Sequence, residues 1–334
     1  MSVFTANSTN NSAAVVLGPT NCTLTAERWT ALNGNALAVC CVILVTQTFN
    51  LFMFNLWRNK EPFVLLHVFL AANSLLRGFV GLFLVITRIL PWNDTVSVLF
   101  VKLTTVFTAV FNAQSSVILL FISIDRWLSV EFPIQYRDKI SKKPIFQSLP
   151  IIVAVTLLLE VPGWLVFWKF LRASCVRPPW VEADTHVWNL TVASLLILLL
   201  LLFQLRILVI AATIRIKILR SRRQVRGQPR SRHAVGVVRI VWSTLRPSMI
   251  VVLVSAVSSI GSSGWVNFEP LIKDPVVLIA VYRLVTVQHM FSPLVYVLFF
   301  PQYQAILVRL FTRFSFNITA FWNGTKACFS STSK

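Results

Sequence analysis

An acid and a base stand side by side at the end of a long uncharged run. The stretch SIDRWLSVEFPIQY, residues 123–136, places Asp125 directly before Arg126, and no other charged residue follows Lys102 before this pair. A guanidinium keeps its proton in a protein, so Arg126 needs an acceptor wherever it lies. If two acceptors compete for it, the pair can switch between two conformations. The alternative is that the pair only ends a helix and, with Trp127, anchors it at a membrane boundary.

Other titratable side chains stand inside apolar stretches, where burial is costly and marks a residue as a functional candidate. They are Arg77, Glu160, Arg206, Arg246, Arg283 and His289. We expect Arg206 to reach the membrane surface or to pair locally. The sequence contains no Gly-rich phosphate loop, HExxH motif or Cys/His metal cluster. We therefore expect no enzymatic activity, no cofactor and no metal site.

The composition is that of a membrane protein. Of the 334 residues, 56% are hydrophobic and 13% are charged, against roughly 25% charged residues in a soluble domain. The mean hydropathy is +0.73, and so much apolar surface needs lipid to cover it. The net charge of +20 comes mainly from segments between the apolar stretches, which argues against a basic face for nucleic acid.

Seven apolar stretches are long enough to cross a bilayer as helices. They lie near residues 31–57, 63–90, 96–127, 145–168, 187–214, 234–262 and 275–298. The sequence therefore predicts an all-α fold, an integral membrane bundle of seven transmembrane helices over residues 31–298. Residues 299–314 alternate bulky apolar and basic side chains after Pro301, which predicts a short amphipathic helix in the interface. Residues 1–30 and 315–334 are predicted to be an extracellular and a cytoplasmic tail.

Two patterns predict the same orientation. If the spans alternate, the basic loops at residues 58–60, 137–143 and 215–239 lie on one side, which is typical of the cytoplasm. The N-terminus then faces outward, in agreement with the glycosylation sequons listed next. These sequons begin at Asn7, Asn10 and Asn21. No short apolar segment of a cleavable signal peptide precedes residue 31, so we expect a multi-pass plasma-membrane protein whose first span starts insertion.

The opening stretch resembles the D-R-Y-x-x-V-x-x-P-x-x-Y motif of rhodopsin-like (class A) G protein-coupled receptors. The matching residues are Asp125, Arg126, Val130, Pro133 and Tyr136, with Trp127 in place of the first Tyr. In the last span, SPLVYVLFFPQY is similar to the family's N-P-x-x-Y element, with Pro293 and Tyr296 in place and Ser292 instead of Asn. Weaker matches are Asn50, Pro162 and Pro247. The resemblance extends over about residues 31–314.

The resemblance implies a mechanism. Arg126 would be held by Asp125 at rest and freed when the sixth helix swings outward, with Pro247 as the bending point. It also implies a heterotrimeric G protein and arrestin as cytoplasmic partners, membrane lipid around the bundle, and an extracellular small-molecule or peptide ligand. The alternative for Pro247 is an inert kink.

Several departures from the family pattern affect what is expected. No Cys stands at the outer end of the third span, so the family's usual disulfide cannot form. Of the five cysteines, we expect only Cys22 and Cys175 to lie outside, where they either bond to each other or stay free. Cys328 is a candidate for palmitoylation. Asn73 and Ser74 stand where the family's sodium-binding Asp is expected, so we predict no sodium allostery.

Two further departures concern activation. No Tyr occurs in the fifth span, because the four tyrosines are Tyr136, Tyr282, Tyr296 and Tyr303. The inner end of the sixth span offers no acid for Arg126. We expect raised basal activity.

The ligand is predicted from the outer halves of the spans. Arg246 and Arg283 could hold an anionic ligand, and the side chains expected to line the same space are Thr108, Asn112, Tyr282 and Thr286. Alternatively each Arg pairs with Glu160 or with backbone carbonyls. Thr108 and Thr286 occupy the positions of the amine-binding Asp and the retinal-binding Lys, so neither ligand is expected.

The many departures make this a divergent branch, with a likeness to odorant-type chemosensory receptors. An orphan peptide or lipid receptor of the same fold is the first alternative. A channel or transporter is the remote one, because the odd number of spans gives no pair of inverted repeats.

Overall fold

The computed structural model describes residues 14–16, 23–57, 62–89, 94–139, 142–167, 183–224, 249–258 and 284–312. In chain order the labelled helices are α1 (Ala26–Leu56), α2 (Pro62–Ile89), α3 (Asp94–Glu131), α4 (Pro133–Lys139), α5 (Lys142–Phe167), α6 (Ala183–Gln224) and α9 (Leu284–Phe299). Two further helices run over Met249–Ser258 and Pro301–Thr312. Before α1, the strands β1 (Ala14–Val16) and β2 (Thr23–Thr25) pair antiparallel. Apart from this short hairpin, the regular elements of the described part are helical, which confirms the predicted all-α class.

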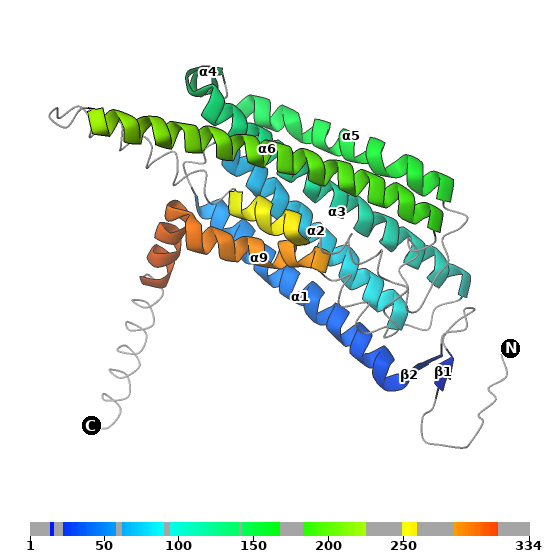
Figure 1. Cartoon of the computed structure of the whole chain (residues 1–334). Helices are drawn as coiled ribbons and strands as arrows, with labels where there is room; N and C mark the ends of the chain where they lie inside the picture. Colours follow the sequence, from blue (N-terminus) through cyan, green and yellow to red (C-terminus); the bar gives the residue numbers. More distant parts are fainter. Residues whose placement is uncertain are drawn as a thin grey trace, which may run out of the picture.

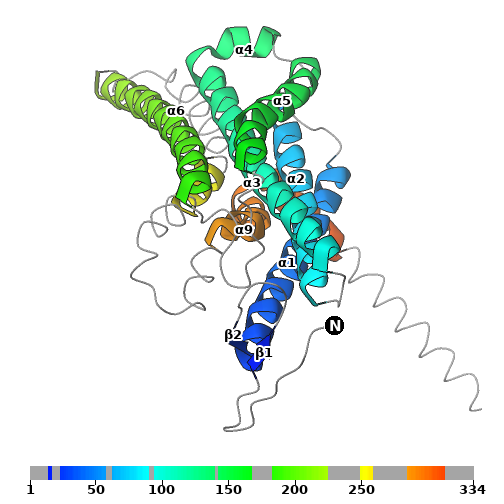
Figure 2. The same cartoon turned by 90° about the vertical axis from the view of Figure 1, so that its right-hand side faces the viewer.

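The long helices form one bundle with α3 at its centre (Figures 1 and 2). α3 packs against α2, α5 and α6, while α1 packs against α2 and α9. α1, α2, α3, α5 and α6 each contain an apolar segment long enough to cross a membrane. The helix Met249–Ser258 and α9 lie inside the sixth and seventh predicted spans, whose remaining residues 234–248, 259–262 and 275–283 lie outside the described ranges.

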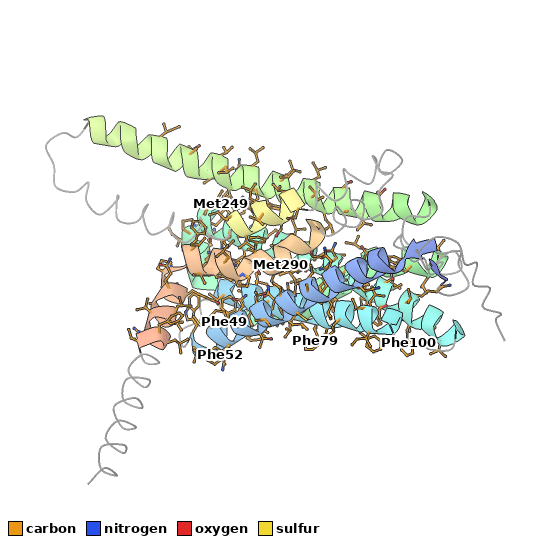
Figure 3. The ribbon with its side chains drawn as sticks, turned by 90° about the horizontal axis from the view of Figure 1, so that it is seen from below. Phe49, Phe52, Phe79, Phe100, Met249 and Met290 are labelled. Carbon is orange, nitrogen blue, oxygen red and sulfur yellow. The ribbon has the colours of Figure 1, made fainter. Side chains whose placement is uncertain are left out.

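The outer surface of the bundle is apolar. Val45 on α1 is 70% exposed and Leu158 on α5 is 73% exposed. Figure 3 shows Phe52 and Phe79 on the outside of α1 and α2 in the same way. Side chains of this size meet lipid in a membrane protein, so the helices carry an apolar face toward the core and another toward the bilayer.

α1 and α2 approach closely at two glycines. A Cβ atom on Gly81 would lie 2.8 Å from Cys40 Sγ, and one on Gly78 would lie 3.0 Å from Ile43 Cγ2. Small residues at a helix contact let two backbones come together, which is a common means of helix association in membranes. The buried Cys40 therefore has the packing role expected of a small apolar side chain, whereas its neighbour Cys41 is exposed.

Three boundaries differ from the sequence predictions. α6 continues as a helix to Gln224, although a loop was expected from residue 215, because the intervening Ile, Leu, Lys and Arg residues favour helix and the next Gly is Gly227. α4 extends over residues 133–139, so the first part of the basic loop expected at residues 137–143 is helical. α1 begins at Ala26 rather than near residue 31.

The chain turns sharply after α9. The segments His289–Phe299 and Pro301–Thr312 are bent by 87° relative to each other. Pro301 suits the first position of a new helix because its missing N–H has no partner there. On the second helix Tyr303 is fully buried, while Val308 and Phe311 are exposed. The helix thus has one apolar side against the bundle and another directed away from it.

Candidate functional site

The Asp125–Arg126 pair is buried at the end of α3 next to α4, called here the Arg126 end of the bundle. Arg126 Nη2 lies 2.5 Å from Asp125 Oδ2, and Arg126 Nε donates to the same oxygen at 3.0 Å. The side chain of Arg126 is only 5% exposed and that of Asp125 is 9% exposed. Removal of either charge alone would be strongly destabilising, because the other charge would stay buried without compensation.

Tyr136 on α4 and Phe63 on α2 complete the surroundings of this pair. The Tyr136 hydroxyl donates to Asp125 Oδ1 at 2.8 Å and accepts from Arg126 Nη2 at 3.4 Å. Burial, and then the charge of Asp125, raises the pKa of the Tyr136 phenol above its usual value, so the phenol stays protonated and can donate. Arg126 Cζ lies 4.0 Å from the centroid of the Phe63 ring, a cation–π distance.

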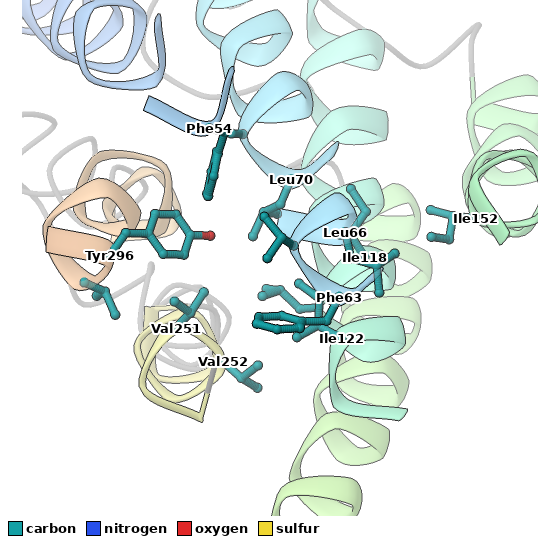
Figure 4. Close-up of a cluster of buried hydrophobic side chains, with 14 of the residues drawn as sticks. Phe54, Phe63, Leu66, Leu70, Ile118, Ile122, Ile152, Val251, Val252 and Tyr296 are labelled. Carbon is teal, nitrogen blue, oxygen red and sulfur yellow. The ribbon is translucent and has the colours of Figure 1, made fainter. Parts of the chain in front are cut away.

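The last-span motif residues lie near this site. Pro293 and Tyr296 are both buried in α9, and Tyr296 forms a 2.9 Å hydrogen bond with Nδ1 of His67 on α2. The Tyr296 ring also packs edge-on against Phe54 at 5.2 Å and Phe300 at 5.2 Å between centroids. In Figure 4 the Tyr296 hydroxyl points toward α2, beside the buried cluster that joins the helices at this level.

Trp127 takes part in a second contact, between α3 and α6. Its Nε1 donates to Glu131 Oε2 at 2.5 Å, and its ring lies 5.6 Å from the Phe203 ring. Arg206 Nη2 donates to Glu131 Oε1 at 2.7 Å, which confirms that Arg206 pairs locally. We call Trp127, Glu131 and Arg206 the α3–α6 clasp. Pro133, also in the motif, is exposed at the start of α4.

A buried polar network joins α1 to α9 deeper in the bundle. Gln47 Nε2 donates to the backbone oxygen of His289 and, at 3.0 Å, to Ser292 Oγ. Asn50 Nδ2 donates to Gln47 Oε1 at 3.3 Å, and the Tyr303 hydroxyl donates to Asn50 Oδ1 at 3.2 Å. Ser292, which stands where the motif has Asn, thus accepts a hydrogen bond from the Gln47 amide.

A second polar group occupies the region expected to hold sodium in the family. Asn73 Nδ2 donates to Ser115 Oγ at 2.7 Å and to the Phe111 carbonyl at 2.8 Å. Ser74 Oγ hydrogen-bonds with His289 Nδ1 at 2.8 Å and donates to a backbone oxygen of its own helix. An amide N–H aimed at Ser115 repels a cation from that oxygen. Asn73 Oδ1 is buried and has no hydrogen-bond partner among the described residues. That sodium does not regulate this chain stays a prediction.

Part of the predicted ligand set can be placed. Thr108 Oγ1 donates to the Thr104 carbonyl at 2.7 Å, Asn112 has a buried Oδ1 with no hydrogen-bond partner among the described residues, and Thr286 is buried in α9. Glu160 accepts a 3.0 Å hydrogen bond from Trp164 Nε1 on its own helix. Arg246, Tyr282 and Arg283 lie outside the described residues, so the predicted cavity is placed only in part.

Other predicted positions also lie outside the described ranges. They are the glycosylation candidates Asn7, Asn10 and Asn21, the cysteines Cys22, Cys175 and Cys328, and Pro247.

Sequence reasoning did not identify Phe63, His67 or Gln47 as neighbours of the motif residues. His67 and Gln47 are polar residues inside apolar spans, so the rule that selected Glu160 and His289 would also have selected them. Phe63 carried no such indication, because one Phe among the 26 of this chain is unremarkable until its ring is seen beside Arg126.

Comparison with known proteins agrees with this geometry. Residues 28–165, from α1 to the end of α5, match the model of the serpentine type 7TM GPCR chemoreceptor family Srbc. The structure resembles the crystal structure of squid rhodopsin with a TM-score of 0.66 over 86% of each chain, at 13% sequence identity. No curated protein matches the sequence. The helix bundle is therefore the rhodopsin fold, and the family match and the fold together support a divergent G protein-coupled receptor of chemosensory type.

Proposed function

We propose that this receptor converts binding of a small extracellular ligand into activation of a heterotrimeric G protein at the Arg126 end of the bundle. The observation that carries the proposal is the buried Asp125–Arg126 pair. Its partners come from different helices, since Tyr136 lies on α4 and Phe63 on α2. A shift between these helices would remove partners from a guanidinium that cannot lose its charge. Ligand binding drives such a shift if the ligand prefers the shifted form.

In this proposal the Arg126 end faces the cytoplasm and the N-terminus lies outside the plasma membrane. The basic residues after α3 and at the end of α6 favour this orientation, because Lys and Arg collect in short cytoplasmic loops. The exposed apolar side of the helix Pro301–Thr312 would lie along the inner leaflet. Arrestin would dock at the same end as the G protein.

We further propose that the ligand is a small anionic molecule or odorant. Thr108, Asn112 and Thr286 would contribute polar groups, and Arg246, Tyr282 and Arg283 would complete the site. The unpartnered Oδ1 of Asn112 supports a ligand with a donor group, because a buried acceptor gains from being hydrogen-bonded.

The test is a panel of acidic, amino-acid and odorant compounds scored by G protein dissociation in cells that express the receptor or its Arg126→Ala variant. We expect at least one compound to act through the intact receptor alone. Arg283→Ala should then abolish the response to an acidic agonist while surface expression is unchanged. Equal responses of the receptor and its Arg126→Ala variant would refute the proposal, and ion flux in proteoliposomes without G protein would favour a channel or transporter instead.

A further inference from the structure

The two motif residues of this receptor meet the same face of α2. Arg126 on α3 lies over the Phe63 ring, and Tyr296 on α9 hydrogen-bonds with His67. Phe63 and His67 are one helical turn apart, and their rings contact each other at 6.0 Å between centroids. One turn of α2 therefore contacts one residue from each motif.

Of the two ring nitrogens of His67, one forms a hydrogen bond and the other has no partner among the described residues. The residue is 1% exposed, and its Nδ1 is bonded to the Tyr296 hydroxyl. Its Nε2 is buried and has no hydrogen-bond partner in the part of the chain that the structure describes. A buried polar atom without a partner is unfavourable, and such atoms in a native protein call for an explanation.

Arg126 needs a second acceptor if it is to leave Asp125. The family mechanism implied by the motif uses a Tyr in the fifth span, but α6 contains no Tyr. On α6, Gln204 Nε2 donates to Ser123 Oγ at 2.8 Å, so this amide is held by α3 about one turn before Arg126. His67 Nε2 is a buried nitrogen without a hydrogen-bond partner among the described residues, and its ring contacts the Phe63 ring over which the guanidinium lies.

We infer that His67 is a positioning residue for both forms of the switch. At rest its Nδ1–H donates to the Tyr296 oxygen, which leaves a lone pair on Nε2. When Arg126 leaves Asp125, its guanidinium donates to Nε2 and stays in the bundle next to Tyr296. This inference rests on the proposed function, since it assigns the second partner of the cation that the function requires. No proton is transferred in the change.

The test replaces His67 by Asn or by Gln, whose side-chain amides lie at different distances from the backbone. The side-chain amide of Asn can replace the Nδ1 of a histidine, whereas that of Gln extends to the position of Nε2. Both changes are made in an Asp125→Asn receptor, in which Arg126 has lost its charged partner and no ligand is needed. Receptor in lipid nanodiscs is mixed with purified heterotrimers of each Gα class, and nucleotide exchange is measured without ligand.

We expect His67→Asn to lower exchange in this background by about tenfold, the effect of losing one hydrogen bond to a charged group. His67→Gln should lower it by less than about twofold. Thermal unfolding midpoints of the purified variants show whether they are equally folded. Equal losses in the two variants, or a larger loss in His67→Gln, would overturn the inference, because packing or the Tyr296 contact alone would then explain the role of His67.

One further variant separates this inference from the proposed function. Arg126→Ala in the same Asp125→Asn background should abolish exchange. If it does, and the two His67 variants behave alike, the inference alone fails. If Arg126→Ala changes nothing, or if no heterotrimer responds to any variant, the proposed function fails and the inference fails with it.

Discussion

At the scale of single residues, we expect Tyr136 on α4 to stabilise the resting form, in which Asp125 and Arg126 are paired. Its hydroxyl contacts both members of the Asp125–Arg126 pair, and burial moves the pKa of this phenol further above physiological pH. We predict that Tyr136→Phe raises ligand-independent G protein activation by about tenfold, since a hydrogen bond to a charged group contributes roughly 1.5–3 kcal/mol. The measurement is the rate of nucleotide exchange on a purified heterotrimeric G protein, catalysed by the purified receptor without ligand.

Phe fills nearly the same volume as Tyr, so surface expression should match that of the unmodified receptor. Basal exchange at or below the unmodified level would mean that Tyr136 does not stabilise the resting form. The double variant Tyr136→Phe with Arg126→Ala serves as the control, and it should show no increase.

At the scale of helix pairs, the α3–α6 clasp uses Trp127, which stands where the motif has Tyr. Glu131 accepts from both Trp127 and Arg206, and an indole N–H reaches this carboxylate along the helix surface. We predict that Glu131→Arg and Arg206→Glu each lower the thermal unfolding midpoint, and that the two changes combined restore most of the loss. Arg206 is 56% exposed, so salt should weaken the effect if water reaches the pair. Additive losses in the double variant would show that the two residues do not interact.

The contact between α1 and α2 depends on Gly81. A Cβ there would lie 2.8 Å from Cys40 Sγ, so we predict that Gly81→Ala destabilises the receptor by about 1–3 kcal/mol through overpacking. The matched control is Gly34→Ala on α1, where a Cβ meets nothing within 4 Å. Thermal unfolding in detergent or nanodiscs measures both. Combining Gly81→Ala with Cys40→Gly should recover part of the midpoint, and an equal effect of the two alanines would contradict the clash.

At the scale of the whole molecule, hydrogen bonds between polar side chains join α2 to α3 and α9 at the place where the resemblance in sequence implies a sodium site. We predict that replacing potassium chloride by sodium chloride at constant ionic strength changes neither the unfolding midpoint nor basal exchange. Asn73→Asp, which adds a carboxylate beside Ser115, should introduce a sodium-dependent rise of the midpoint because hard cations prefer charged oxygen ligands. If sodium raised the unfolding midpoint of the unmodified receptor as much as that of Asn73→Asp, the side chains around Asn73 and Ser115 would bind the ion without an added carboxylate.

Much of the architecture follows from local composition. A run of about twenty apolar residues must form a helix in lipid, because every backbone N–H and C=O needs a partner there. Pro301 follows α9 and has no backbone N–H, so it cannot continue the hydrogen bonding of that helix but can begin a new one. The sharp turn before Pro301 confirms the predicted start of a separate helix. The ends of helices outside the membrane were not predictable in this way. α6 continues beyond the apolar run to Gln224 because, once outside lipid, water satisfies the backbone equally well in a loop or a helix.

The sequence by itself therefore determined the helical spans, the adjacent acid and base and the likeness of two motifs to a receptor family, since these depend on residue types and spacing along the chain. Only the tertiary structure decided that Phe63 covers Arg126, that His67 meets Tyr296 and that Glu131 joins α3 to α6. Such contacts join residues up to 229 positions apart. They depend on how each helix is rotated about its axis, and that rotation is set by the packing of its neighbours rather than by its own sequence.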